Sequence, residues 1–287
     1  MTDLKHLSKS NQVWERHKLA SLTIAESYEG SEYKRYAERI RRCAEVLKFQ
    51  LLEGEAKLSQ ANFCRVRHCP ICQWRRSLQW KARAYQGLPA LVENFPTDRW
   101  LFLTLTVRNC PIEELRKNID CMNKGYRRMT RRKAWCVRGW VRSTEVTRGQ
   151  DRLSHPHFHC LLMIPASYFS GKKYLSHRAW QKLWQESMQI DYTPIIHVKA
   201  LPRGISPTEL VPEILKYQTK VSDITTDSYW LIELTKQLKG SRAITIGGAI
   251  TDHVKKSNAY SSHQPIDKDL TGALYFCWEN QLQSYLS

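Results

Sequence analysis

The segment 155–159 (HPHFH) constrains the fold more than any other stretch, because it runs directly into the apolar residues 160–164. Side chains of a β-strand alternate between its two faces, so His155, His157 and His159 would share one face. The side chains that would point the other way, into a core, are Phe158, Cys160 and Leu162. A row of imidazoles on a strand anchored by its opposite face is a suitable platform for a metal ion. The alternative is a set of ordinary solvated or core histidines.

The net charge points to a polyanionic partner. The 287-residue chain carries 45 Lys and Arg against 27 Asp and Glu, a formal charge of +18, and nucleic acid is the usual partner of such a chain. The cations gather in two stretches that contain no carboxylate, residues 64–92 and 124–142. Aromatic residues interleaved there suit stacking on exposed bases, although each alone is typical of a core. The expected DNA contacts are Arg75, Arg76, Arg127, Arg128, Arg131 and Arg132.

Membrane insertion and secretion are not indicated. No apolar run approaches the ~20 residues that a membrane-spanning helix needs, and residues 1–12 are polar, without the apolar core of a signal peptide. We therefore expect a cytoplasmic protein that does not bind a membrane. In that compartment the nine cysteines would be metal-binding thiolates or small core residues rather than disulfides.

Four of the cysteines have a spacing typical of a zinc site. Cys69 and Cys72 form a C-P-x-C knuckle that places two sulfurs on one tight turn, and Cys43 and Cys64 would complete a tetrahedral structural Zn²⁺ site. Cys43 is far away in sequence, so His68 is a rival for the fourth position, and a metal-free reduced turn is the alternative. A basic helix would follow the knuckle, which makes the module a candidate DNA-binding appendage.

The order of predicted elements indicates an α+β fold. Strands are expected at residues 99–107, 135–147, 155–164 and 193–201, and helices at residues 112–132 and 175–187. The resulting order of strand, helix, strand, strand, helix, strand is that of a ferredoxin-like or RRM-like fold with an antiparallel sheet and flanking helices. Residues 149–151 would form the hairpin turn before the histidine strand.

The same hairpin would bring a carboxylate to the histidines. Glu145 lies on the strand that pairs with the one carrying His157 and His159, so it can supply a third ligand. Two imidazoles and a carboxylate with open positions suit Mg²⁺ or Mn²⁺ when the other partner is a phosphate. The alternative is that Glu145 forms a salt bridge with a local arginine.

A second group of chemically competent residues follows Ser206-Pro207, a typical helix start, although Pro212 could delay the regular helix by a turn. At offsets of 0, 3, 4 and 7, one helix face would carry Glu213, Lys216, Tyr217 and Lys220. A tyrosine oxygen beside a cation is a competent nucleophile towards a phosphodiester, and a carboxylate one turn away can act as a general base. The alternative is an exposed helix with ordinary charge pairs.

Together these motifs resemble the HUH endonucleases, and more closely the Rep-type rolling-circle replication initiators of small bacterial plasmids, with a single tyrosine. The resemblance spans residues 43–248. Its motifs are HFH at 157–159, YQTK at 217–220, FLTLT at 102–106, a glutamate four residues before the tyrosine, and FCRVRHCPICQWRR at 63–76. Each motif alone is weak, but their order and spacing are specific.

The resemblance implies a mechanism. Tyr217 would attack the scissile phosphate of single-stranded or hairpin DNA at a plasmid origin, become linked to the 5′-phosphate and free a 3′-hydroxyl for a polymerase. Glu213 would activate water at termination. The metal would bind His157, His159 and a third ligand, which we assign to Glu145, whereas His155 is either a spare ligand or a phosphate contact. A host helicase and polymerase are possible partners.

The expected organisation is a mobile or loosely helical leader (1–35), a zinc module (36–95), an HUH domain (96–250) with a fifth strand at 243–250, and a C-terminal extension (251–287) to which we assign no function. Two competing interpretations remain open. One is a non-enzymatic, zinc-dependent DNA-binding regulator, which would have no use for the quartet around Tyr217. The other is a single-tyrosine HUH transposase, a class that is usually shorter and lacks the cysteine module. A relaxase arranges its histidines and tyrosine differently.

Overall fold

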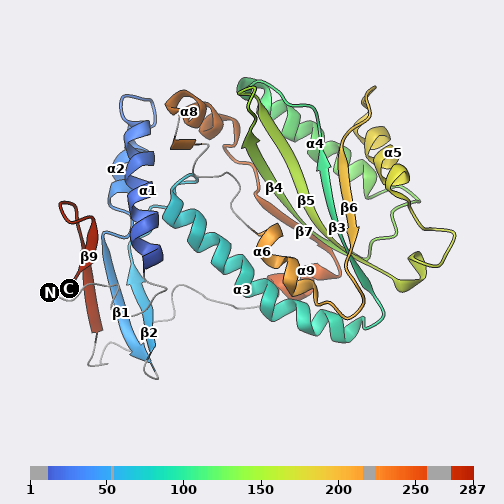
Figure 1. The fold of residues 1–287 in the computed structure, drawn as a ribbon, viewed down its shortest axis with the longest axis horizontal. Coiled ribbons are helices and arrows are strands. Elements are labelled where there is room, and N and C mark those ends of the chain that lie inside the picture. The colour runs from blue at the N-terminus through green and yellow to red at the C-terminus, as the bar shows by residue number, and fades with distance from the viewer. Residues whose placement is uncertain (1–11, 53–54, 216–223, 226, 257–272) are drawn as a thin grey trace. The chain divides into compact units, whose positions relative to one another are not determined.

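The computed structural model describes residues 12–52, 55–215, 224–225, 227–256 and 273–287 (Figure 1). By its internal contacts the chain divides into two compact units. We term residues 1–76, 221–235 and 260–287 the cysteine unit, and residues 77–220 and 236–259 the sheet unit. Antiparallel sheets and helices build the fold, so it is of the α+β class expected from the sequence. The domain limits at residues 35, 95 and 250 stay predictions.

The cysteine unit contains a four-stranded antiparallel sheet of order β2-β1-β8-β9. Its strands are β1 (Val46–Leu52), β2 (Glu55–Ala61), β8 (Ala273–Glu279) and β9 (Ser284–Leu286). β1 and β8 bury the same face, where Leu47 of β1 pairs with Phe276 of β8 and both side chains are buried. None of these strands was predicted from the sequence, and two of them come from the C-terminal residues to which no function was assigned.

Helices α1 (Gln12–Tyr28) and α2 (Lys34–Arg41) also belong to the cysteine unit. α1 lies in the segment expected to be a mobile or loosely helical leader, yet it buries Trp14, Ile24 and Tyr28. The Tyr28 hydroxyl is 2.6 Å from Thr235 Oγ1, in helix α8 (Ser228–Gln237). These contacts fix α1 within the unit rather than leaving it as a loose leader.

The sheet unit contains a five-stranded antiparallel sheet of order β6-β3-β5-β4-β7. Its strands are β3 (Arg99–Thr106), β4 (Gly139–Arg148), β5 (Ser154–Ile164), β6 (Ile196–Ala200) and β7 (Ile244–Gly248). The predicted order of elements and the β4–β5 hairpin are confirmed. β4 and β6 begin three or more residues later than expected. For β6, Pro194 supplies a reason, since it has no backbone N–H for a ladder.

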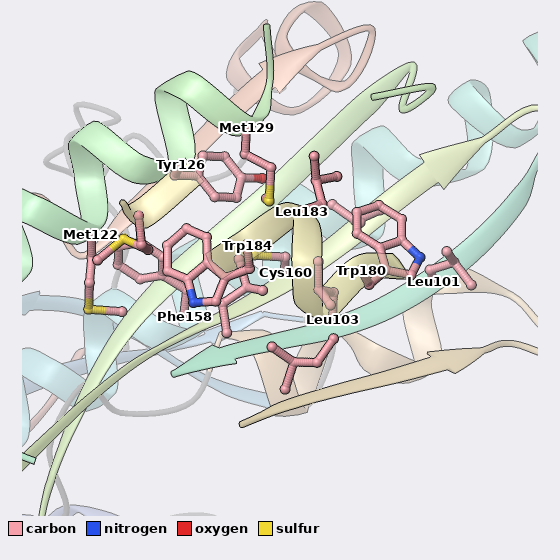
Figure 2. Packing of buried hydrophobic residues seen from close by; sticks show 14 of the residues in the cluster. Leu101, Leu103, Met122, Tyr126, Met129, Phe158, Cys160, Trp180, Leu183 and Trp184 are labelled. Atoms are coloured by element: carbon pink, nitrogen blue, oxygen red, sulfur yellow. The ribbon is translucent and has the colours of Figure 1, made fainter. Parts of the chain in front are cut away.

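One face of this sheet packs against helices α4 (Leu115–Met129) and α5 (His177–Met188). Figure 2 shows Tyr126 of α4 and Trp184 of α5 beside Phe158 and Cys160 of β5 in this core. Phe158, Cys160 and Leu162 are fully buried, as the alternation of β5 predicts. The buried Trp184 indole N–H donates to the Thr106 carbonyl oxygen at 2.9 Å, so this large side chain leaves no polar atom unsatisfied. Its truncation to Ala would cost roughly 3–5 kcal/mol.

Part of the opposite face is covered by a second apolar core. Apolar side chains from the part of helix α3 (Pro70–Asn94) in this unit and from α9 (Ile250–Lys256) pack with Leu161 and Met163 of β5. The N-terminal half of β5 carries histidines on this same face. The register therefore places a polar site beside an apolar core on one sheet surface.

The segment after β6 differs from the single helix expected. A 3₁₀ turn covers Pro207–Leu210, capped by Ser206, and α6 is a four-residue helix, Val211–Ile214. Pro212 explains the break, since it has no N–H to donate to the turn before it. The Ser206 cap is confirmed, and Pro212 delays the regular helix, as the sequence allowed.

Candidate functional site

The candidate site of the sheet unit is a group of three buried side chains from β4 and β5. Glu145 pairs in register with His157, and Ser143 pairs with His159, so Glu145 and both imidazoles share one face. Glu145 Oε2 lies 2.9 Å from His159 Nε2 and 3.3 Å from His157 Nε2. The three ligand atoms lie within 4.8 Å of one another, and the group could hold a metal ion. The predicted approach of Glu145 to the two histidines is confirmed.

Contacts on the far side of each ring orient these imidazoles. His157 Nδ1 is 3.1 Å from the carbonyl oxygen of His155. A carbonyl only accepts, so Nδ1 carries a hydrogen and Nε2 is the ring nitrogen that faces Glu145. His159 Nδ1 is 3.1 Å from Thr104 Oγ1, and the ring of Phe102 stacks on His159 at 5.5 Å. A carboxylate oxygen that faces two ring nitrogens is stabilised by a shared cation, which can be a proton on Nε2, as in the 2.9 Å hydrogen bond with His159, or a divalent metal.

His155 lies beside this group without joining it. Its ring is 5.1 Å from that of His157, and its Nδ1 is 2.6 Å from Asn109 Oδ1. The amide of Asn109 is oriented by Asp151, whose Oδ2 accepts from Nδ2 at 3.1 Å. Burial lowers the pKa of His155, and the neighbouring His157 lowers it further. The structure therefore links His155 through Nδ1 to Asn109 and, through Asn109, to Asp151 of the hairpin turn.

The cysteine unit holds a second group of ligands, Cys43, Cys64, Cys69 and Cys72. All four are buried, and Cys72 Sγ is 3.6 Å from the sulfurs of both Cys43 and Cys64. Backbone amides also point at the sulfurs, with Arg65 N 3.2 Å from Cys72 Sγ. Hydrogen bonds from the other three thiols, that of Cys43 the strongest, hold the pKa of Cys69 well below its usual value. A buried four-sulfur cluster of this kind could bind a metal ion.

The fourth position of the cluster is Cys43 and not its rival, His68. The His68 side chain is buried, and its Nε2 has no hydrogen-bond partner among the residues that the structure describes. Burial, aided by nearby arginines, lowers the pKa of His68 to about 3, so the ring is neutral. Cys43 reaches the cluster from the turn after α2, where its Sγ lies 3.6 Å from Cys72 Sγ and 3.4 Å from the backbone nitrogen of Cys64.

Sequence reasoning missed the contribution of α1 to this cluster. The buried Lys18 ammonium donates to the carbonyl oxygens of Arg41 and Cys43 at 2.6 and 2.9 Å. Ser21 Oγ lies 3.7 Å from Cys69 Sγ. The buried positions 14, 18, 21, 25 and 28 have helical spacing. Because Lys18 and Ser21 are polar, the sequence shows no continuous apolar stripe along this helix face.

The predicted DNA-binding arginines divide into two classes. Arg127, Arg131 and Arg132 are exposed. Arg128 instead donates from Nε to the Ser187 carbonyl oxygen at 2.6 Å, at the C-terminal end of α5, and so stabilises the fold. Arg75 lies over the rings of Trp14 and Phe63, and both it and Arg76 are only partly exposed.

The predicted catalytic quartet is described only in part. Glu213 is exposed in α6. Lys216, Tyr217 and Lys220 lie outside the described residues. In the part of the chain that the structure describes, no helix is long and apolar enough to cross a membrane.

The comparisons of this chain with known proteins all indicate one family. The replication protein family matches residues 55–274. The chain is 35% identical over 252 residues to Protein rep of Lactiplantibacillus plantarum, covering 83% of this chain and 79% of that protein. It is 35% identical over 261 residues to Protein rep of Lentilactobacillus hilgardii (85% and 83%), and 33% identical over 264 residues to that of Streptococcus pneumoniae serotype 2 (88% and 82%). No solved structure gives a significant match. The chain, with its two metal-ligand groups and its excess of cations, therefore belongs to the Rep family of replication proteins, the plasmid replication initiators.

Proposed function

We propose that this chain starts rolling-circle replication of a plasmid by nicking one strand of its origin DNA. The observation that carries the proposal is the group of Glu145, His157 and His159 on the sheet surface. Burying a carboxylate beside two imidazoles costs stability unless a cation, either a proton or a metal ion, is shared between them. A protein that only binds DNA gains nothing from that cost, whereas a metal-dependent endonuclease requires it.

The topology supports a ferredoxin-like HUH endonuclease fold for this part of the chain. β3 and β5 lie at the centre of the sheet between β6 and β4, and β7 extends it as a fifth strand. The helices α4 and α5 connect the strands in the order of the split β-α-β arrangement. The proposed catalytic domain is residues 96–250, between a zinc module at 36–95 and a C-terminal extension.

Glu145, His157 and His159 would hold the catalytic cation. Two imidazole nitrogens and a carboxylate oxygen suit Mn²⁺, and they suit Mg²⁺ when water and phosphate oxygens complete the set. Such a cation, when bound, supplies Lewis-acid polarisation of the scissile phosphate and stabilises the charge that develops on it. The contacts of His157 with the His155 carbonyl group and of His159 with Thr104 hold both rings in the ligating orientation.

Tyr217 is the proposed nucleophile. Its Oη forms a bond to phosphorus while the bond from phosphorus to the 3′-oxygen breaks, and the phenol proton ends on the departing 3′-oxygen. The DNA then remains linked to Tyr217 through its 5′-phosphate, and the free 3′-hydroxyl primes synthesis. Lys216 and Lys220 would stabilise the phenolate or clamp the phosphate. Glu213 would accept a proton from the water that ends the round.

The four-cysteine cluster is proposed to hold a structural Zn²⁺, because four thiolates in a closed, buried site are typical of zinc. The exposed Arg127, Arg131 and Arg132 would contact phosphates of origin DNA, in single-stranded or hairpin form. Arg75, Arg76 and Arg128 are weaker candidates, since two of them already have partners within the fold. A host helicase and polymerase would act on the nicked product.

The decisive experiment incubates the full chain with supercoiled plasmid carrying the replicon's origin, with Mg²⁺ or Mn²⁺, and determines the mass of the 5′ adduct. Wild-type protein should give nicked circles with protein on the 5′ end. Tyr217→Phe should bind the DNA and leave it intact. Normal nicking by Tyr217→Phe would show that the nucleophile is another residue.

The competing function is a non-enzymatic, zinc-dependent regulator, with a single-tyrosine HUH transposase as a second alternative. A regulator would bind origin DNA without nicking under any metal condition. A transposase would nick and rejoin element ends in preference to a plasmid origin. Both outcomes are readable in the same assay when element-end and origin substrates are compared.

A further inference from the structure

The edge strand β6 carries a row of exposed side chains on the face that bears the proposed metal site. Thr104 of β3 pairs with both His197 of β6 and His159 of β5, so these three residues lie in line across the sheet. Phe102 likewise pairs with Lys199. Residues paired in this way share a face, so His197 and Lys199 lie on the surface of the sheet that carries the metal ligands.

Ile195 extends the row by one position. The Thr106 hydroxyl donates to the carbonyl oxygen of Ile195 at 2.8 Å, and Thr106 pairs with His157 on its other side. The three side chains at 195, 197 and 199 therefore alternate with Ile196, which is buried in the opposite core. Adjacent strands lie roughly 4.8 Å apart, so this β6 row runs roughly 10 Å from the histidines of β5.

The side chains of the β6 row (Ile195, His197 and Lys199) are exposed to solvent. Ile195 is 66% exposed, and His197 and Lys199 are exposed. Within the described residues, neither His197 nor Lys199 has a hydrogen-bond or ion-pair partner for its side chain. Some other cations of the sheet unit do have partners, such as Arg138, which pairs with Asp98 at 2.6 Å. An unused cation so close to a metal-ligand group is what a phosphate-binding position requires.

The strand between the two rows adds no negative charge on this face. Its residues there are the half-buried Phe102 and the buried Thr104 and Thr106. The β6 row itself contains no carboxylate that would repel a phosphate. A lysine on an edge strand also prevents sheets from pairing edge to edge. That explanation accounts for Lys199, but it gives no reason for the exposure of Ile195 at the other end of the row.

We propose that Ile195, His197 and Lys199 form a second contact row for single-stranded DNA, parallel to the metal-ligand strand. Lys199 and His197 hold a backbone phosphate next to the scissile one, and Ile195 packs against a sugar or an unstacked base. The inference rests on the proposed function, because it takes the strand cut at Glu145, His157 and His159 to be the strand held here. Ile195, His197 and Lys199 would position the DNA strand and take no part in bond cleavage.

The test measures DNA binding without cleavage. Full-length wild-type protein and the His197→Ala/Lys199→Ala double variant are titrated, without added Mg²⁺ or Mn²⁺, onto fluorescein-labelled oligodeoxythymidylate at several salt concentrations. The double variant should bind about tenfold more weakly, and its slope of log K against log[salt] should fall by about 0.7 for each phosphate that it no longer neutralises. Lys199→Arg should keep most of the affinity, since it keeps the charge.

Lys117→Ala is the matched control, because Lys117 is exposed in the same unit but on α4, which covers the other face of the sheet. Unchanged affinity and salt slope in the double variant would overturn the proposal. So would equal decreases in the double variant and in Lys117→Ala, which would indicate a diffuse charge effect. Analytical sedimentation of wild type and the double variant tests whether β6 instead pairs with a second copy of the chain. If wild type is a dimer and the double variant is a monomer that still binds DNA, the edge is a dimer interface and the proposal is overturned.

The two proposals fail in different ways. If the chain never nicks DNA yet the double variant binds it more weakly, the β6 row stands as a single-strand contact and the proposed function fails. If the chain nicks its origin, and the double variant reaches half of its maximal rate at the same DNA concentration as wild type, the β6 row is not a DNA contact and the proposed nicking function holds. When both hold, the double variant should need about tenfold more DNA with its rate at saturation unchanged.

Discussion

Glu145 on β4 lies directly opposite His157 on β5, and the carboxylate oxygen Oε2 that approaches this histidine at 3.3 Å also contacts the next histidine along the strand at 2.9 Å. One oxygen thus faces two ring nitrogens on a buried surface. Such a group is stable when a cation is shared between the three atoms. Removing the charge of the carboxylate, or the support behind one of the rings, should therefore weaken the binding of that cation.

Replacing Glu145 by Gln keeps the shape of the side chain and removes its charge. We expect the affinity for Mn²⁺, measured by calorimetry on the full chain, to fall at least tenfold, or by about 1.4 kcal/mol or more, because the only anionic ligand of the group is removed. Asp191→Asn, at an exposed position of the same unit, should bind Mn²⁺ as wild type does. Equal affinities in Glu145→Gln and wild type would show that the carboxylate is not a ligand.

Thr104→Val tests the support behind the ligands. With a cation on Nε2, the hydrogen of His159 sits on Nδ1, and Thr104 Oγ1 accepts it at 3.1 Å. Valine has the same shape but cannot accept, so the ring is no longer held in one orientation and the Mn²⁺ affinity should fall about 10-fold. Since valine fills the same space at this buried position, the fold should stay intact, which circular dichroism checks. A variant with wild-type affinity would mean that neighbouring Phe102 alone orients the ring.

Cys43→Ser and His68→Gln separate the two candidates for the fourth ligand position. The structure places Cys43 Sγ 3.6 Å from Cys72 Sγ, whereas His68 is buried outside the cluster. Purified wild type and His68→Gln should carry one Zn²⁺ per chain by elemental mass spectrometry, and Cys43→Ser should release it during dialysis. Retention of zinc by Cys43→Ser together with its release from His68→Gln would reverse the assignment.

The site residues were predictable from sequence where the information is local. The period of two along residues 155–164 determines which side chains of β5 face the core and which face the metal group. The short connection after Arg148 makes β4 the hairpin partner of β5, and this pairing brings Glu145 opposite His157. Because these relationships depend on neighbouring residues alone, they follow from pattern and turn chemistry.

The cysteine unit was not predictable in the same way. Its sheet pairs Leu47 with Phe276, more than two hundred residues away, and no local periodicity encodes such a partner. The packing of helix α1 was missed because its buried face includes Lys18 and Ser21, which contact carbonyl and sulfur groups of the cysteine cluster. Tertiary contacts, and not helical propensity, make this polar segment ordered.

A buried histidine in the same unit gives a pH dependence whose sign can be worked out. Burial, with a smaller effect of Arg16, lowers the pKa of His17 from 6.5 to about 4. Between about pH 6.5 and 4, His17 therefore binds a proton in the unfolded chain but not in the folded chain. The contribution of His17 to stability is fully present above pH 6.5 and disappears as the pH falls through this window, with a slope of at most ~1.4 kcal/mol per pH unit.

His17→Gln removes this titration while keeping a polar side chain of similar length. His17 stacks on Trp74 at 5.0 Å, so the variant should be less stable than wild type at pH 7. Between pH 7 and pH 5, however, its free energy of unfolding in urea should fall less steeply than that of wild type. Protonation of the cysteine cluster is common to both proteins, so the difference between the two slopes isolates His17. Parallel slopes would mean that the His17 ring is protonated in the folded protein and that solvent reaches it despite its 6% exposure.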